Sequence, residues 1–226
     1  MSWESTVPYY QTINRVVREH LGGLHSARIV IYSVDFHEIE RFQHAGRWTE
    51  AAEILVGAAR CLERAGAECL ILCTNTMHKV APQIEASVTI PLLHIADATA
   101  RRIAAVGIGK VGLLGTRFTM EEDFYRDRLA TDHALEVLTP SREDRDTVHR
   151  VIYDELCLGT VDDESRTEFR RIVRDLVSKG AQAVILGCTE IGLLLRPADV
   201  SVPLFDTAQI HAEEAALYAL HETAGT

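Results

Sequence analysis

The chain has 226 residues, of which 47% are hydrophobic and 25% are charged. That length and composition suit one or two globular domains with a substantial core. The net charge of −10, with Lys and Arg scattered along the chain, argues against a nucleic-acid groove. No apolar run approaches the roughly 20 residues that span a bilayer, and the five cysteines lack the spacing of a disulfide framework. We therefore expect a reduced, cytoplasmic protein with neither a nucleic-acid nor a membrane partner.

Short apolar runs alternate with stretches of helical periodicity along the chain. The expected elements, in chain order, are helix 6–21, strand 28–34, helix 49–64, strand 68–73, strand 91–95, helix 98–105, strand 110–115, helix 120–131, strand 136–138, helix 145–158, helix 165–178, strand 183–187, strand 202–205 and helix 208–221. Strands that are apolar on both faces and alternate with helices form parallel sheets covered on both sides. The pattern predicts an α/β fold.

Two segments of the chain share one plan. Residues 64–100 and 178–212 each carry Gly-Ala, a strand, a corner of Cys and Thr, a helical stretch and a strand that begins at proline. Thr74 and Cys188 each stand eight residues after the glycine of their segment. The repeat predicts two pseudo-symmetric lobes, each with a parallel sheet flanked by helices. Because ligands bind at the carboxyl ends of parallel strands, Thr74 and Cys188 should face a shared active-site cleft from opposite lobes.

The repeat also extends upstream of these corners. Tyr9-Tyr10 aligns with Phe124-Tyr125, and this register sets Met1 opposite Thr116. The strand 110–115 then has no counterpart, so we expect the first strand of the N-terminal lobe to be missing. The predicted N-terminal lobe covers residues 1–100 and is completed by the C-terminal helix 207–226, and the second lobe covers residues 101–206.

The two corners carry groups that suit proton transfer at a carbon atom. Stereoinversion needs one group to remove a proton and a second group to return a proton on the opposite face. Cysteine, with a pKa of about 8.5, is suited to the first role, and a helix start after Cys188 would lower its pKa further. Threonine has no comparable ionised population, so Thr74 can donate or relay a proton. The substrate carboxylate would be held by nearby hydroxyl and amide groups: Asn75, Thr76, Thr116 and Thr189.

The motifs "CTNTMHK", "LLGTRFTM", "LGCTEIGLLL" and "FDTAQIHAEEA" together resemble the aspartate/glutamate racemases, specifically the branch with a "CTNTMH" corner. The resemblance implies a homodimer of two-lobed chains that inverts amino acids at Cα without pyridoxal phosphate, metal or other cofactor. It assigns the catalytic roles to Thr74 and Cys188, with Cys188 abstracting the proton of the L enantiomer. Cys73, one place early, should point away. Met1, opposite Thr116 in register, and Gln43, in a loop that the family places near the substrate, complete the predicted binding set.

Other functions remain open on the residues alone. One well-placed thiol also suits a malonate-type decarboxylase, a hydantoin racemase is close to the same motifs, and a non-catalytic amino-acid-binding protein would keep the cleft without the reaction. The substrate side chain is not determined either, because only Arg41 and Arg47 lie near the motifs as partners for a second carboxylate. Aspartate, glutamate or a broader set of polar amino acids all fit.

Overall fold

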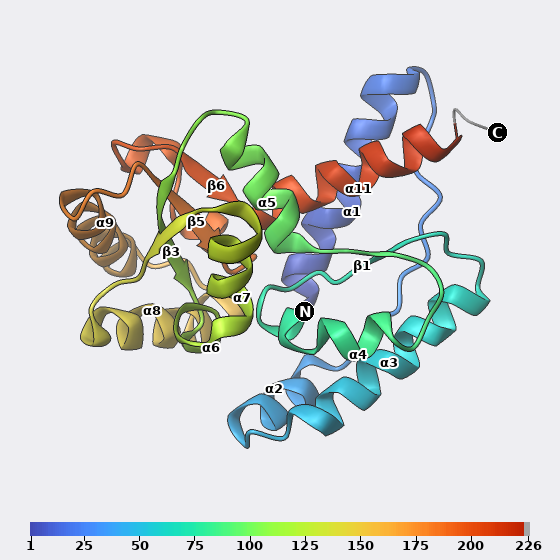
Figure 1. Ribbon diagram of the computed structural model, residues 1–226, viewed down its shortest axis with the longest axis horizontal. Helices are drawn as coiled ribbons and strands as arrows, with labels where there is room; N and C mark the ends of the chain where they lie inside the picture. The colour runs from blue at the N-terminus through green and yellow to red at the C-terminus, as the bar shows by residue number, and fades with distance from the viewer. Residues whose placement is uncertain (224–226) are drawn as a thin grey trace.

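The computed structural model describes residues 1–223 as two lobes joined along helices near the middle of the molecule (Figure 1). The elements of the N-terminal lobe are α1 (Trp3–Leu21), α2 (Phe36–His44), α3 (Trp48–Arg64), β1 (Leu70–Ile71), η1 (Thr76–Val80), α4 (Ala81–Glu85), β2 (Leu92–Leu93) and α5 (Ile95–Ala104). The rest are β3 (Lys110–Gly115), α6 (Arg117–Glu121), α7 (Asp123–Asp127), η2 (Arg128–Asp132), β4 (Glu136–Leu138), α8 (Arg142–Asp154), η3 (Leu156–Leu158), α9 (Asp163–Ser178), β5 (Ala183–Gly187), α10 (Ile191–Leu194), η4 (Pro197–Asp199), β6 (Leu204–Asp206) and α11 (Thr207–Thr223).

Two parallel sheets form the centres of the lobes. The second lobe has strands in the order β4-β3-β5-β6, with all three neighbouring pairs parallel, and the N-terminal lobe pairs β1 with β2 in parallel. The predicted α/β class with parallel sheets is therefore confirmed. The expected strands 110–115, 136–138 and 183–187 match β3, β4 and β5 residue for residue.

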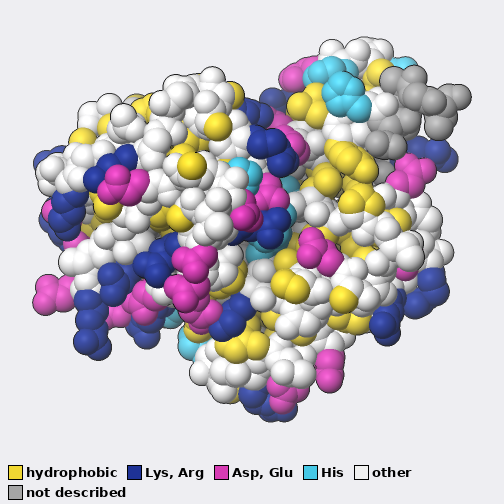
Figure 2. Space-filling view, viewed as in Figure 1, with side chains coloured by type: hydrophobic (Ala, Val, Ile, Leu, Met, Phe, Trp, Pro, Cys, Tyr) yellow, Lys and Arg dark blue, Asp and Glu magenta, His cyan; other side chains and the backbone are white. Residues whose placement is uncertain are grey.

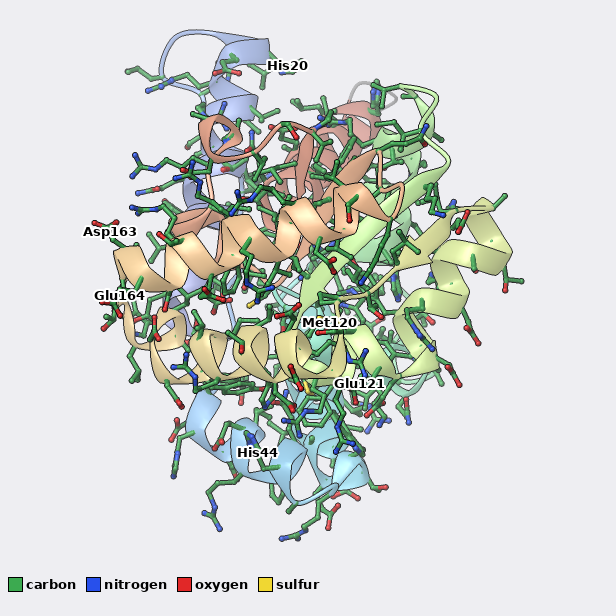
Figure 3. The ribbon with its side chains drawn as sticks, turned by 90° about the vertical axis from the view of Figure 1, so that its left-hand side faces the viewer. His20, His44, Met120, Glu121, Asp163 and Glu164 are labelled. Atoms are coloured by element: carbon green, nitrogen blue, oxygen red, sulfur yellow. The ribbon has the colours of Figure 1, made fainter. Side chains whose placement is uncertain are left out.

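Helices α8 and α9 cover one face of the four-stranded sheet (Figure 3). The central strands β3 and β5 are almost entirely buried beneath them. Glycine is required where these strands end, since a Cβ on Gly115 would lie 2.8 Å from the Gly187 carbonyl oxygen. The strands can therefore bring their carboxyl ends, and the residues that follow, close together.

The C-terminal helix packs on the N-terminal lobe. Tyr9, Ile13 and Val16 of α1 form a buried cluster with small residues of α11, Ala212 and Ala216. The small side chains let the two helices approach closely, and α11 also contacts α5. The division into the two predicted domains, including completion of the N-terminal lobe by α11, stays a prediction. Residues 224–226 of the predicted C-terminal helix lie outside the described residues. No helix among residues 1–223 is long and apolar enough to cross a membrane.

The N-terminal lobe differs from the sequence expectation in one strand. Residues 28–34, predicted as a strand, form no ladder, and Val30, Ile31 and Tyr32 are about half exposed, at 51%, 50% and 51%. Within residues 1–223 this lobe has two paired strands where the second lobe has four. The segment lacks a neighbouring strand, and without one its backbone groups cannot form a ladder.

One loop prediction and one helix prediction were also wrong. Residues 36–44, which contain the expected Gln43 loop, form helix α2, capped at its start by the Asp35 carboxylate. This stretch is mostly polar and buries only Ile39 and Gln43, so its helical periodicity is weak in the sequence. The single helix predicted over 120–131 is instead divided into α6, α7 and the π-type turn η2, because the chain leaves helical geometry at Glu122.

Candidate active site

A cavity between the lobes brings the predicted site residues together. It lies beyond the carboxyl ends of β1 and β5, and its lining includes all eight of them: Met1, Gln43, Thr74, Asn75, Thr76, Thr116, Cys188 and Thr189. Residues 1–223 contain no group of three or more His, Cys, Asp or Glu side chains placed to hold a metal ion. The cavity volume is about 30 Å³, which holds a water molecule but not an amino acid. Substrate entry therefore requires side chains or lobes to move apart.

His78 holds the first corner in place. Its Nδ1 lies 2.7 Å from the Thr74 carbonyl oxygen, and its Nε2 accepts a hydrogen bond from the Ile95 backbone N–H. A carbonyl only accepts, so Nδ1 carries the proton and the ring is neutral. Burial, followed by the neighbouring rings of His94 and His211, holds the pKa of His78 well below its ordinary value. The neutral imidazole thus ties the Thr74 backbone to the start of α5.

Asn75 presents an unpartnered acceptor. Its Nδ2 donates to Thr207 Oγ1 at 2.9 Å, while the Thr207 hydroxyl donates its own proton to the Leu186 carbonyl. This chain of bonds fixes the orientation of the amide. Asn75 Oδ1 is buried and has no hydrogen-bond partner among the described residues. Because a buried unpaired acceptor is costly, this atom is suited to receive a donor from a bound ligand.

Three hydroxyls meet across the boundary between the lobes. Thr76 Oγ1 lies 2.8 Å from Thr116 Oγ1, and both lie within 3.4 Å of Thr119 Oγ1. Thr76 follows β1 in one lobe, whereas Thr116 follows β3 in the other and caps α6. Each hydroxyl can donate one proton, so the cluster can turn its O–H groups toward a carboxylate.

Cys188 is hydrogen-bonded to a glutamate that the sequence analysis did not select. Its thiol, 7% exposed, donates to Glu190 Oε2 at 3.1 Å. The same carboxylate accepts 2.6 Å hydrogen bonds from Ser2 Oγ and Thr189 Oγ1. Burial alone would raise the pKa of Glu190, but the N-terminal ammonium and these donors hold the pKa below its ordinary value. Glu190 is therefore an ionised, buried acceptor beside the thiol.

The expected lowering of the Cys188 pKa is not observed. Burial, together with the negative charge of Glu190, raises the pKa of this thiol well above its ordinary value. The short helix after the corner begins only at Ile191 and does not offset these effects. In the structure without substrate, Cys188 is accordingly a neutral thiol, and its ionisation requires a proton acceptor or a nearby positive charge.

Cys73 faces a different space. It lines an apolar groove on the N-terminal lobe instead of the cavity that holds Thr74. Burial raises the pKa of Cys73 to about 11. The Met1 ammonium lies between the two spaces and donates to the Cys73 carbonyl oxygen at 2.5 Å. The one-residue offset between Cys73 and Thr74 thus places their side chains in separate environments.

Gln43 reaches the cavity from helix α2. Its Oε1 accepts a 2.9 Å hydrogen bond from Tyr153 of α8, and its Nε2 donates to Met77 Sδ. His44 of the same helix contacts the ring of Tyr153 and lies below α8 in Figure 3. The clearest signal that the sequence analysis missed was Glu190, which directly follows "GCT" in the sequence. The lining residues that it did not predict are Ser2, Phe36, Ile152, Tyr153, Cys157, Gly187 and Glu190.

Comparison with known proteins decides the family. The Asp/Glu/Hydantoin racemase family model matches residues 1–215. The chain belongs to this family. Membership supports the activity of an amino-acid racemase, which is an isomerase. Among curated relatives, a glutamate racemase from Thermus thermophilus is 29% identical over 161 residues. The match covers 69% of this chain and 56% of that enzyme, so this chain spans just over half of the enzyme's length.

Solved structures of the same family share the fold. A candidate Asp/Glu racemase from Yersinia pestis is 58% identical, with a TM-score of 0.90 over 97% of this chain and 96% of that one. An aspartate racemase homologue from Pyrococcus horikoshii is 38% identical, with a TM-score of 0.82 over 96% of this chain and 94% of that one. A Picrophilus torridus aspartate racemase, 20% identical with a TM-score of 0.72 over 98% of this chain and 89% of that one, shares the fold.

Proposed function

We propose that this protein is a cofactor-independent racemase that inverts L-amino acids at Cα by proton transfer from two sides. The observation that carries the proposal is that Thr74 and Cys188 follow β1 and β5 in opposite lobes and line one cavity. A planar carbanion held between them can lose a proton toward one residue and regain a proton from the other. As in the resemblance, a homodimer is the proposed assembly.

Glu190 can act as the proton acceptor that Cys188 needs in order to ionise. In the proposed reaction the Glu190 carboxylate takes the thiol proton across the existing hydrogen bond, and the resulting thiolate removes the Cα proton. The α-ammonium of a bound amino acid would help, since a positive charge near a thiolate lowers its pKa. Thr74 then relays a proton from solvent to the opposite face of Cα, so that its own hydroxyl is restored. Cys188 keeps the Cα proton as its thiol, and the proton on Glu190 returns to solvent, which restores the starting state.

The polar groups of the cavity suit the two charged ends of an amino acid. Asn75 Oδ1 is free to accept from the α-ammonium, and the hydroxyls of Thr76, Thr116 and Thr189 can donate to the α-carboxylate. A carboxylate held by several donors also stabilises the enediolate-like charge that develops during proton removal. The cavity therefore supports binding of substrate and of the transition state.

We also propose that the preferred substrates have uncharged side chains. The described residues that line the cavity include no Lys or Arg, whereas Glu190 contributes a negative charge. Arg47 is paired with Glu50 and lies over the Phe42 ring, and Arg41 lines a separate surface hollow.

The Met1 ammonium is the cationic group in the described lining, and it already donates to Ser5 Oγ and to the Cys73 carbonyl oxygen while balancing the charge of Glu190. A second carboxylate, as in aspartate or glutamate, would have to compete with Glu190 for it.

Incubation with single L-amino acids in D₂O tests both parts of the proposal. Loss of the Cα proton signal by NMR, together with formation of the D enantiomer by chiral chromatography, is expected for L-serine, L-alanine or L-glutamine above L-aspartate and L-glutamate. Cys188→Ser is the matched control, because it keeps the shape of the side chain and removes the thiol. Saturable binding without exchange, or carbon dioxide release from a malonate, would refute the racemase assignment.

A further inference from the structure

The two lobes are joined by charged pairs at the surface and by neutral hydrogen bonds in the interior. Basic and acidic side chains lie side by side where the lobes meet on the face shown in Figure 2, and Lys79 pairs with Glu122 across this boundary. In the interior, the Thr207 hydroxyl connects Asn75, which follows β1, with the Leu186 carbonyl of β5. Thr207 is fully buried and does not line the cavity. It can therefore act on the site only through the residues that it contacts.

Neither Asn75 nor Thr207 uses its side chain for a local helix cap. Asparagine is a favoured N-cap residue, yet Asn75, at the start of η1, makes no side-chain cap hydrogen bond. Thr207 begins α11, where the Asp206 carboxylate accepts hydrogen bonds from the backbone N–H groups of Ala208 and Gln209. Both side chains are therefore available to bond to each other, and Asn75 Nδ2 lies 2.9 Å from Thr207 Oγ1.

The directions of the two hydrogen bonds at Thr207 fix the orientation of the Asn75 amide. A carbonyl only accepts, so the single hydroxyl proton of Thr207 goes to the Leu186 carbonyl oxygen, 2.8 Å away. Thr207 Oγ1 then has only lone pairs left for Asn75, and the amide must present its NH₂ group there. The other end of the amide, Asn75 Oδ1, is buried without a partner among the described residues. The Thr207 hydroxyl thus decides that the unpartnered end of Asn75 is an acceptor.

We propose that Thr207 is a positioning residue that makes the site select ligands with an α-ammonium group. The inference rests on the part of the proposed function in which Asn75 Oδ1 accepts from the α-ammonium. If the amide turned over, its NH₂ group would meet the ammonium, and two donors cannot bond to each other. With the amide held as it is, a carboxylic acid that lacks the ammonium leaves Oδ1 buried and unpaired, which weakens its binding.

Binding of matched ligands measures this selectivity. L-alanine is compared with propionate, and L-serine with 3-hydroxypropionate, because the members of each pair differ only in the ammonium group. Isothermal titration calorimetry gives the ratio of their dissociation constants and does not require turnover. The unaltered protein should bind the amino acid at least about tenfold more tightly than its partner acid. Thr207→Val keeps the shape of the side chain and removes the hydroxyl, so it should weaken amino-acid binding about tenfold and change acid binding by less than about twofold.

Three further variants make the test specific to the Asn75 amide. Thr207→Ser keeps the hydroxyl and should keep the ratio of the unaltered protein. Thr99→Val is the matched control, since Thr99 is also fully buried but donates to the Ile95 carbonyl within α5, and the ratio should not change. Asn75→Asp combined with Thr207→Val should recover the preference for the amino acid, because a carboxylate presents an oxygen in either orientation.

Two results would overturn the inference. Thr207→Val could keep the ratio of the unaltered protein, or it could weaken both ligands of a pair equally, which would show a structural role alone. If Thr207→Val does not fold, Thr207→Ala takes its place with the same expected loss of selectivity.

Failure of the inference is distinguishable from failure of the proposed function. Cα exchange in D₂O together with unchanged selectivity in Thr207→Val would refute the role of Thr207 and leave the racemase assignment intact. Selectivity that is lost in Thr207→Val, in a protein that catalyses no Cα exchange, would support the role of Thr207 and refute the racemase assignment.

Discussion

Glu190→Gln tests the pairing between the Glu190 carboxylate and the Cys188 thiol, because glutamine keeps the shape of the side chain and removes its charge. In the structure the carboxylate raises the pKa of the thiol by opposing formation of the thiolate. In the proposed reaction the same carboxylate accepts the thiol proton. The substitution should therefore make Cys188 more acidic and, at the same time, less able to act as a base catalyst.

The size of the effect follows from the geometry of the pair. Glu190 Oε2 lies 3.1 Å from Cys188 Sγ. With an effective dielectric constant of about 20, two negative charges at this separation repel by roughly 5 kcal/mol. This upper bound equals about four pKa units. Rearrangement of the hydrogen bonds from Ser2 and Thr189 will reduce it, so we expect the pKa of Cys188 to fall by at least about one unit.

Alkylation by iodoacetamide measures this pKa directly. The rate at the Cys188 peptide, resolved by mass spectrometry from pH 6 to 11, reports the thiolate fraction. Loss of the proton acceptor should also lower the rate of Cα exchange by about 100-fold. Glu155→Gln is the control, since Glu155 is also partly buried but bonds to Ser165 and Arg150. An unchanged or higher pKa of Cys188 in Glu190→Gln would refute the reasoning.

Three further predictions follow from individual contacts. Cys188→Ala should abolish Cα exchange from the L enantiomer, whereas Thr74→Ala should weaken inversion more than exchange. Deuterium NMR measures the exchange and chiral chromatography measures the inversion. Near-normal L-to-D turnover in Cys188→Ala would contradict the assignment. Asn75→Leu removes the free acceptor Oδ1, and the KM of the best substrate should rise about 10- to 100-fold, with a smaller change in kcat. Burial alone would raise the pKa of Asp97, but its hydrogen bonds, above all from Arg128, hold the pKa well below its ordinary value. Because this pKa is lower in the folded state, the stabilisation is complete above about pH 5 and is lost as the pH falls. Asp97→Asn should lower Tm at pH 7 by about 3 °C and flatten its fall in acid; equal Tm profiles would contradict this.

Elements with strong periodicity could be predicted because local pattern and burial agree. Residues 111–115 of β3 and all of β5 are apolar or glycine and buried, so neither face needs a separate signal. Helix α2 and the break at Glu122 could not be predicted, because polar side chains dominate both and their packing depends on residues that are distant in the sequence. Gln43, for example, is buried by Tyr153 and Met77, which lie far away in the sequence.

The sequence by itself determined the class of fold, the repeat and the pair of corners at Thr74 and Cys188, since these depend on residue spacing along one strand. The tertiary structure alone decided the electrostatics of the site. Glu190 is hydrogen-bonded directly to Cys188 and is held by Ser2, which lies 188 positions away in the sequence. The pKa of the thiol depends on burial that no local pattern encodes. The tertiary structure also decided the conformation of segment 28–34. Its apolar run favours a strand, but a strand needs a neighbour for its backbone hydrogen bonds, and none of the described residues occupies that place.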